Sequence, residues 1–362
     1  MRKRTLALVA LLLAVWLTGC RGGESGPRNV VLMIGDGMGI THVTAAKVAF
    51  GELHMERMPV AGLCMTHAAD ALVTDSAASG TALATGKKTY NGAVSVDPES
   101  RAPIETVAEE AEALGMATGL VVTCSVVHAT PAVFVAHVDD RGKYIEIAEQ
   151  IAESGLEVLF GGGSTYFLPD WVPGGSRRDG EDLVDRMRQR MAVALTESEF
   201  RELGDVDAAA ALLWPEHPPT VADRSVSLAE LTRKALEILS RDPDGFFLMV
   251  EGAQIDWAGH ENMQDWLVNE TRDFDDAVGV ALDFAEDDGG TLVVVTADHE
   301  CGGFALVGGS VDEGRVESRF ASVHHTAAMV PVLATGPGSE RFGGIKDNTE
   351  IGELLSRAVV GR

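Results

Sequence analysis

Short runs of consecutive apolar residues alternate along this chain with segments of helical periodicity. The runs fall at residues 29–34, 117–124, 156–160, 246–250 and 291–296, and the helical segments at 40–50, 104–114, 143–154, 228–240 and 266–285. An unbroken apolar run is typical of a strand buried on both faces, as in a parallel sheet covered by helices. We therefore predict an α/β protein with a mostly parallel central sheet and helices on both faces.

The remaining segments complete this organisation. Residues 60–65 and 330–334 predict further strands, and residues 348–360 predict a closing helix. Residues 169–221 mix proline, glycine and charge with short helices, chiefly at 181–194, and we predict an excursion outside the sheet there. A chain of 362 residues can bury one large core. We expect one domain over residues 29–362 that includes this excursion.

The N-terminus has the pattern of an export signal. Basic residues at positions 2–4 precede an apolar run over 6–17, which ends at Gly19 and Cys20. The run is too short to span a bilayer, and the pattern resembles a bacterial lipoprotein signal. We predict that residues 1–19 are removed, that Cys20 is lipidated, and that residues 20–28 form a flexible tether. The protein would then be exported and lipid-anchored to the cell envelope, on the periplasmic side or the cell surface.

The chain is strongly acidic, with a formal net charge of −26. This charge argues against nucleic acid or an anionic membrane surface as a partner. It can also reflect solubility or adaptation to salt. An anionic substrate would need a local cationic site, and because no lysine or arginine cluster supplies one, bound metal ions are the alternative.

Cys64, Cys124 and Cys301 are the cysteines beyond Cys20. Their spacing fits no zinc finger, and at most one internal disulfide can form among them. We expect structural thiols, since cysteine is usually buried. Cys301 merits separate attention because it lies two residues after His299.

A stretch of small residues at 73–86 predicts a tightly packed helix whose first turn presents Ser76. Asp75 precedes this helix as a candidate N-cap, and Gly86 ends it. Free N–H groups and the helix dipole favour an anion beside Ser76. Ser76 is therefore a candidate nucleophile for a phosphoryl group. The alternative is that Asp75 and Ser76 only cap the helix.

Acids and histidines follow three of the predicted strands. Asp36 follows the first strand, Glu251 the strand at 246–250, and Asp298 with His299 the strand at 291–296. Ligands of parallel sheets lie beyond the carboxyl ends of the strands, so these side chains could meet at one edge. Asp256 and His260 are four residues apart and could face one ion from a helical turn. Any one of these acids could instead be a cap or a solvated loop residue, but their repetition favours a metal cluster.

Four segments together resemble the alkaline phosphatase family: residues 34–39 (IGDGMG), 74–81, 250–260 and 296–300 (TADHE). They occur in the family's order and with similar spacing, and the similarity covers most of the chain after Pro27. The resemblance implies two zinc ions and one magnesium ion. It assigns Asp256, His260 and His325 to the first zinc, Asp36, Asp298 and His299 to the second, and Asp36, Thr130 and Glu251 to magnesium. His324 is the alternative to His325, and would otherwise be an outer-shell partner.

Residues 127–132 and 136–141 match the family's magnesium and arginine segment. The resemblance implies that Arg141 grips two phosphate oxygens, although an arginine after two aspartates could also form a surface ion pair. His128 stands where some members carry aspartate, so the third site could take another divalent ion. Trp257 lies at a position that differs between members. His128, Asp75 and Trp257 are thus possible outer-shell residues, and we assign structural or surface roles to the remaining histidines, which are His42, His54, His67, His137 and His217.

The resemblance implies an alkaline phosphatase that hydrolyses phosphate monoesters through a phosphoseryl intermediate on Ser76. It also implies a broad range of small phosphomonoester substrates and a homodimer. One alternative is a phosphodiesterase or sulfatase on the same metal scaffold, but Ser76 with Arg141 favours monoesters. A second alternative is a metal- or phosphate-binding lipoprotein without catalysis, which would not need an aligned Ser76.

Overall fold

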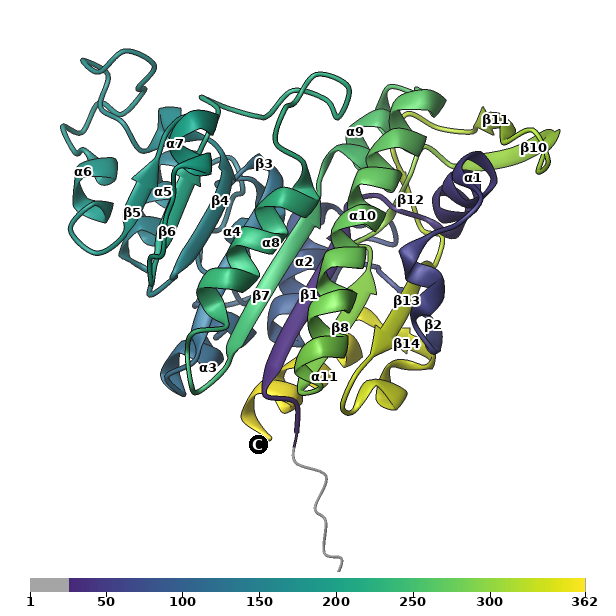
Figure 1. The fold of residues 1–362 in the computed structure, drawn as a ribbon, viewed down its shortest axis with the longest axis horizontal. Helices are drawn as coiled ribbons and strands as arrows, with labels where there is room; N and C mark the ends of the chain where they lie inside the picture. Colours follow the sequence, from purple (N-terminus) through teal and green to yellow (C-terminus); the bar gives the residue numbers. More distant parts are fainter. Residues whose placement is uncertain (1–25, 362) are drawn as a thin grey trace, which may run out of the picture.

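A ten-stranded sheet forms the centre of the molecule (Figure 1). The computed structural model describes residues 26–361, so the predicted signal and Cys20 lie outside the described residues. The strand order is β14-β2-β13-β8-β1-β7-β3-β4-β6-β5. The four strands at its middle are β8 (Thr291–Thr296), β1 (Asn29–Gly35), β7 (Phe246–Gly252) and β3 (Ala117–Ser125). They are parallel and buried along their whole length, which confirms the predicted mostly parallel α/β sheet.

The register of these strands brings the predicted ligands to one edge. Ile34 in β1 pairs with Glu251 in β7 on one side and with Thr296 in β8 on the other. Asp36 lies two residues after Ile34, and Asp298 lies two residues after Thr296. The carboxyl ends of three adjacent strands therefore deliver acidic side chains to one place.

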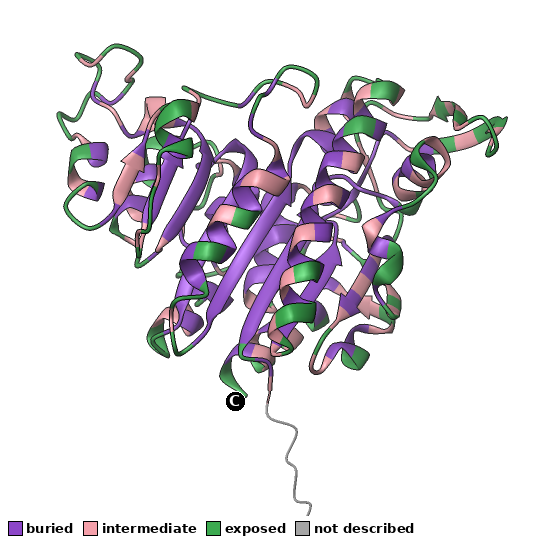
Figure 2. Ribbon diagram, viewed as in Figure 1, coloured by how far each residue is buried: buried purple, intermediate pink, exposed green. Residues whose placement is uncertain are grey.

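Helices cover both faces of the sheet (Figure 1). One layer contains α8 (Leu228–Leu239) and α10 (Gln264–Asp288), which pack together, with α1 (Ile40–Phe50) against α10. The other contains α2 (Ser76–Thr85), α3 (Val107–Ala113) and α11 (Asn348–Val360). In Figure 2 the central strands are buried and the helices are exposed on their outer sides, as expected for amphipathic helices on a sheet.

One side of the sheet is not purely parallel. β13 (Val330–Thr335) runs antiparallel to β8 and to β2 (Val60–Met65), and β14 (Gly344–Asp347) is parallel to β2. Beyond the sheet, β10 (Phe304–Ser310) and β11 (Arg315–Phe320) form a hairpin. A short pair, β9 (Glu300–Cys301) with β12 (His325–Thr326), lies beside the predicted ligands.

The prediction for residues 169–221 is partly wrong. This segment contributes β5 (Ala192–Ala194) and β6 (Ala209–Leu212), which extend the sheet beyond β4 (Val158–Gly162). The predicted helix at 181–194 is only α6 (Leu183–Met187). The short alanine-rich run of β6 is fully buried, so it joins the sheet despite its proline- and glycine-rich surroundings.

The boundaries of two other predicted segments also differ. The predicted helix at 104–114 begins only at Val107, because Thr106 caps it and Glu109 closes a capping box. Arg28, placed in the tether, donates its N–H to the Gly290 carbonyl at 2.8 Å. The predicted boundary of the domain at residue 29 is therefore one residue too late, since Arg28 already bonds to the domain.

The other α-helices described are α4 (Ala129–Ala132), α5 (Tyr144–Glu153), α7 (Glu197–Arg201) and α9 (Gln254–His260).

Candidate metal and phosphate site

Ser76 lies at the first turn of α2, as its sequence context predicts. Asp75 is the N-cap and accepts a hydrogen bond from the Ala78 N–H at 2.9 Å. The helix ends at Gly86, whose φ of 69° favours glycine. Ser76 is buried, and its Oγ lies 3.3 Å from His299 Nε2. The hydroxyl therefore faces the acids and imidazoles rather than bulk solvent.

The strand ends place Asp36, Asp298 and His299 around one point. All three are fully buried. Asp298 Oδ1 accepts the N–H groups of Gly37 and His299 at 3.1 and 3.0 Å, which fixes the carboxylate. Its Oδ2 lies 3.1 Å from His299 Nε2, and Asp36 Oδ1 lies 3.5 Å from the same nitrogen.

Asp256, His260 and His325 form a second group. His260 Nδ1 faces the Val323 carbonyl at 2.7 Å and His325 Nδ1 faces the Thr74 carbonyl at 2.9 Å, so each Nδ1 must donate. In the neutral imidazoles each Nε2 then carries a lone pair, and these two nitrogens lie only 3.1 Å apart. Both are 3.3 Å from oxygens of Asp256. Converging lone pairs of this kind fit a bound cation.

Several buried oxygens at this edge have no hydrogen-bond partner within residues 26–361. They are both carboxylate oxygens of Asp36, Glu251 Oε1, Asp256 Oδ1, Asp298 Oδ2 and Thr130 Oγ1. An unpaired buried carboxylate is costly unless it binds a cation. Two groups of ligand atoms lie within 4.8 Å of one another. The first group comprises Asp256, His260, Cys301 and His325, and the second comprises Asp36, Asp256 and His299. The donor sets therefore fit divalent metal ions, with imidazole and carboxylate suited to zinc and the oxygens of Asp36, Glu251 and Thr130 suited to magnesium.

The electrostatics of the cluster agree with cation binding. Burial, followed by repulsion from Asp298, Asp256 and Glu251, holds the pKa of Asp36 well above its usual range. Burial raises the pKa of Glu251 to about 8, although the Thr130 hydroxyl and the Cys124 thiol oppose this rise. The hydrogen bond to Asp256 raises the pKa of His260 to about 9. Burial also opposes charge at Asp256 and Asp298, but the neighbouring histidines outweigh it and lower the pKa of both carboxyls. Without a metal ion, protons on Asp36 and Glu251 and positive charge on the histidines therefore balance these acids, and metal ions would supply that charge instead.

Arg141 reaches the start of α2. Its Nη1 donates to Asp75 Oδ2 at 3.0 Å, and its Nη2 lies 3.4 Å from His128 Nε2. The surface ion pair considered from the sequence is absent among the described residues, since Asp139 pairs with Lys143 at 2.7 Å instead. Arg141 therefore contacts the N-cap of α2, the residue before Ser76 in the chain.

A group of aromatic rings borders the site. The His128 ring lies 6.1 Å from Trp257, between ring centroids. His217, to which we gave a structural or surface role, lies 4.7 Å from Trp257 and 5.7 Å from His128. Its Nδ1 accepts the Ser125 N–H at 3.1 Å. The sequence carries no signal for this placement, because His217 sits in a proline-rich segment without a motif.

The structure separates the two adjacent late histidines. His325 joins the group with Asp256 and His260, whereas His324 is exposed. Among the other histidines given structural or surface roles, His42 is buried and accepts the Gly39 N–H at 3.1 Å, and His54, His67 and His137 lie 3.8, 3.1 and 2.9 Å from carboxylates.

The three cysteines are free and buried, and two of them adjoin the site. Cys124 donates to Glu251 Oε2 at 3.3 Å. Cys301 places its Sγ among the ligand atoms of Asp256, His260 and His325. Cys64 lies in β2, where its thiol donates to the Met65 carbonyl at 3.4 Å.

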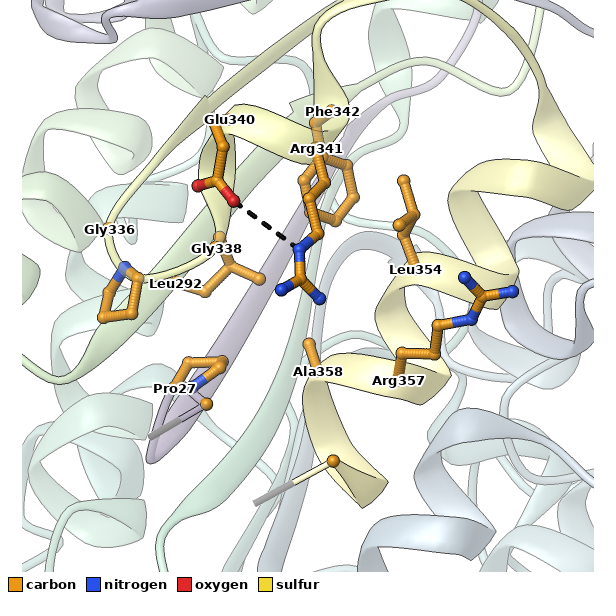
Figure 3. Close-up of a pocket in the computed structure, with 13 residues that line it drawn as sticks. Pro27, Leu292, Gly336, Gly338, Glu340, Arg341, Phe342, Leu354, Arg357 and Ala358 are labelled. Carbon is orange, nitrogen blue, oxygen red and sulfur yellow. Dashed lines mark ion pairs between the residues drawn. The ribbon is translucent and has the colours of Figure 1, made fainter. Parts of the chain in front are cut away.

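A separate cavity of about 540 Å³ lies at the opposite end of the sheet (Figure 3). Pro27, Leu292 and Phe342 line it together with residues of α11. Its two arginines are already paired, Arg341 with Glu340 at 3.5 Å and Arg357 with Glu353 at 3.2 Å. This cavity holds none of the predicted ligands, so we place the chemistry at the strand ends.

The chain is similar to known proteins over most of its length. Residues 27–319 match the family model for alkaline phosphatase. Alkaline phosphatase 3 of Bacillus subtilis is 36% identical over 94% of this chain and 90% of its own. Streptomycin-6-phosphate phosphatase of Streptomyces griseus is 34% identical over 94% of this chain and 92% of its own.

Solved structures show the same similarity. The alkaline phosphatase from the Antarctic bacterium TAB5 is 37% identical, with a TM-score of 0.85 over 93% of this chain and 98% of that one. A histidine-to-aspartate mutant of the TAB5 enzyme, with Mg bound in the M3 site, superposes with the same TM-score. The chain belongs to the alkaline phosphatase family, and it is a metal-dependent phosphomonoester hydrolase.

Proposed function

We propose that this enzyme hydrolyses phosphate monoesters through a phosphoseryl intermediate on Ser76. The observation that supports it is the position of the Ser76 hydroxyl, buried at the N-terminus of α2 and 3.3 Å from His299 in the acid and imidazole cluster. A hydroxyl is a weak nucleophile unless its surroundings favour the alkoxide.

Three metal ions fit the donor atoms. Asp256, His260 and His325 would hold one zinc ion, Asp36, Asp298 and His299 a second, and Asp36, Thr130 and Glu251 a magnesium ion. When bound, such ions supply the positive charge that lowers the pKa of a serine hydroxyl and stabilises the departing oxygen. His128 lies beside Arg141 near the third site, so that site could take another divalent ion.

The chain's own residues carry the remaining steps. Ser76 Oγ attacks phosphorus as the bond to the alcohol oxygen breaks, and the alcohol leaves after taking up a proton. Water then attacks the phosphoserine, which releases inorganic phosphate and restores the hydroxyl. Arg141 and the free N–H groups of α2 would hold the phosphoryl oxygens throughout. Since these groups all address the phosphoryl group, we expect a broad range of alcohols.

Replacement of the nucleophile tests this proposal. Ser76→Ala should abolish the phosphoenzyme, detected by mass spectrometry after acid quenching, and nearly all turnover of a simple monoester. Ser227→Ala is the matched control, because Ser227 also stands at a helix N-terminus but caps α8 through the Glu230 N–H and belongs to neither ligand group. Normal turnover by Ser76→Ala would exclude Ser76 as the nucleophile. The rate on a diester, measured beside it, distinguishes a monoesterase from a diesterase.

Elemental analysis tests the metals. We expect two zinc ions and one magnesium ion per chain, and loss of one zinc ion in Asp256→Asn. The TAB5 histidine-to-aspartate mutant has Mg bound in its M3 site. We infer that His128 corresponds to that histidine, so His128→Asp should raise magnesium retention after dialysis. Unchanged retention would contradict this assignment.

We also propose that a lipid on Cys20 anchors the exported enzyme to the cell envelope. No helix within residues 26–361 is long and apolar enough to cross a bilayer. Pro27 lies at the cavity of Figure 3, opposite the ligand cluster, so an anchored enzyme would present its site away from the membrane. Cys20→Ala should move the protein from the detergent phase to the aqueous phase. A homodimer, expected from the family, can be checked by sedimentation.

A further inference from the structure

Cys301 lies against the first metal group in a way that the general family pattern does not require. It is fully buried in β9, and its register partner across the β9–β12 pair is His325. Directly paired residues of an antiparallel ladder present their side chains on the same face. The Cys301 Sγ accordingly joins Asp256, His260 and His325 in one group whose ligand atoms all lie within 4.8 Å of one another.

Two glycines make room for this side chain. A Cβ at Gly259 would lie 3.1 Å from the Cys301 Sγ, and a Cβ at Gly37 would lie 2.9 Å from the Cys301 Cβ. Gly259 belongs to the helix that carries Asp256 and His260, and Gly37 follows Asp36. The backbone thus approaches the thiol closely from both ligand-bearing segments, which holds the sulfur beside the ligand atoms.

A second, independent observation is that hydrogen bonds do not satisfy all the polar atoms of this group, which leaves them available to a cation. Asp256 is 5% exposed, and its Oδ1 is buried with no hydrogen-bond partner in the described part of the chain. The Nε2 atoms of His260 and His325 face each other at 3.1 Å, although both Nδ1 atoms donate elsewhere. One carboxylate, two imidazoles and one thiol therefore surround a common centre.

We propose that the Cys301 thiolate is a fourth protein donor to the metal ion bound by Asp256, His260 and His325. This proposal rests on the metal assignment made above and adds a ligand to it. On binding, the S–H bond breaks, its proton passes to solvent and a sulfur–metal bond forms, with no change of oxidation state. A soft sulfur donor selects zinc or cobalt over magnesium. Zinc can expand to five ligands during reaction, which leaves a position for substrate oxygen.

Cobalt substitution tests the sulfur bond directly. The full-length protein is stripped of metal, reloaded with Co²⁺ alone and examined by absorption spectroscopy. We expect visible bands of bound cobalt and, in addition, an intense sulfur-to-cobalt charge-transfer band in the near ultraviolet. Cys301→Ser keeps a side chain of similar size and should lose the charge-transfer band while it retains the visible bands. Cys64→Ser removes a buried thiol of β2 and should keep both. X-ray absorption of the zinc form should show a Zn–S distance of about 2.3 Å that Cys301→Ser lacks.

The possible results separate the two proposals. Visible bands without a charge-transfer band in the unaltered protein would overturn the sulfur ligand and leave the metal site of the proposed function intact. A charge-transfer band that survives in Cys301→Ser would also overturn it, because another thiol would then be the donor. Absence of all cobalt bands would overturn both proposals. Circular dichroism establishes that Cys301→Ser is folded, and Cys301→Ala provides a second variant if it is not.

Discussion

Asp75 links the stability of α2 to the binding of phosphate, so its replacement should affect both. Its Oδ1 caps α2 at the Ala78 N–H, and its Oδ2 accepts the Gly92 N–H at 3.0 Å and Arg141 Nη1 at 3.0 Å. The lost cap costs about 1 kcal/mol. The lost Gly92 bond costs about 1 kcal/mol. The Arg141 pair adds about 1 kcal/mol, since both side chains keep 21–24% of their surface exposed.

Asp75→Ala should therefore lower the free energy of unfolding by about 3 kcal/mol. With about 0.7 kcal/mol/K of unfolding entropy for a chain of this size, the melting temperature falls by about 4 °C. Arg141 also loses the partner that orients it. Because ordering such a side chain costs about 0.5–1.5 kcal/mol, the inhibition constant of inorganic phosphate should rise by about 2- to 10-fold.

Urea unfolding of the metal-loaded protein and phosphate inhibition of monoester hydrolysis measure the two effects. Asp182→Ala is the matched control, because Asp182 caps α6 with one bond to the Asp185 N–H and lies away from the ligands. It should lose the cap energy alone and leave phosphate inhibition unchanged. The role derived for Asp75 is refuted if Asp75→Ala loses no more stability than this control and if phosphate inhibits it as strongly as it inhibits the unaltered enzyme.

Three further predictions concern packing and charge. Arg224→Leu should destabilise the protein by about 3–5 kcal/mol, because it leaves the buried carboxylates of Glu270 and Asp273, each 2.7 Å from Arg224 Nη2, without their cation. A loss below about 1 kcal/mol in urea unfolding would contradict this prediction. Gly352→Ala should cost about 1–3 kcal/mol, because its Cβ would lie 2.3 Å from the Ala82 carbonyl of α2, and calorimetry of the variant checks it. The difference in unfolding free energy between Glu109→Gln and the unaltered protein should be largest between pH 4.5 and 6.5. Burial opposes charge at His137, but the hydrogen bonds with Glu109 and the Ser95 carbonyl, together with the charge of Glu109, outweigh burial and raise the pKa of His137 above 6.5. This contribution to stability is therefore lost as pH rises through the raised pKa. Burial likewise opposes charge at Glu109, but its bonds to His137 and Thr106 lower the pKa of Glu109 below 4.5, so that contribution is lost as pH falls through the lowered pKa. A pH-independent difference in urea unfolding would contradict the pairing.

Burial decides which strands could be predicted from the sequence. β1, β7 and β8 are covered on both faces, so their apolar runs are unbroken and their ends could be placed within two residues. β5 and β6 are short and lie among prolines, glycines and charged residues, so no apolar run long enough to predict a strand is visible there. The β10–β11 hairpin is largely exposed and its register shifts between Leu306 and Gly308, so it lacks a clean alternation.

The same reasoning applies to the site. Asp36, Glu251 and Asp298 could be predicted because strand ends of a parallel sheet meet at one edge. The carbonyls of Thr74 and Val323, which orient His325 and His260, could not, because any residue type can supply a backbone acceptor. His217 reaches the site through the path of its loop, for which the sequence has no periodic signal.

The position of β1 at the centre of the sheet determines when the site can assemble. β1 is the first strand within residues 26–361, yet its partners begin only at Phe246 and Thr291, and α11, which packs on α2, begins only at Asn348. Closing such long loops is slow and requires the distant segments to exist. In a nascent chain we therefore expect Asp36 to remain apart from Glu251 and Asp298 until β7 and β8 have been made. We therefore expect phosphatase activity only after β7, β8 and the segment that carries His325 are available to fold against β1 and complete the ligand cluster.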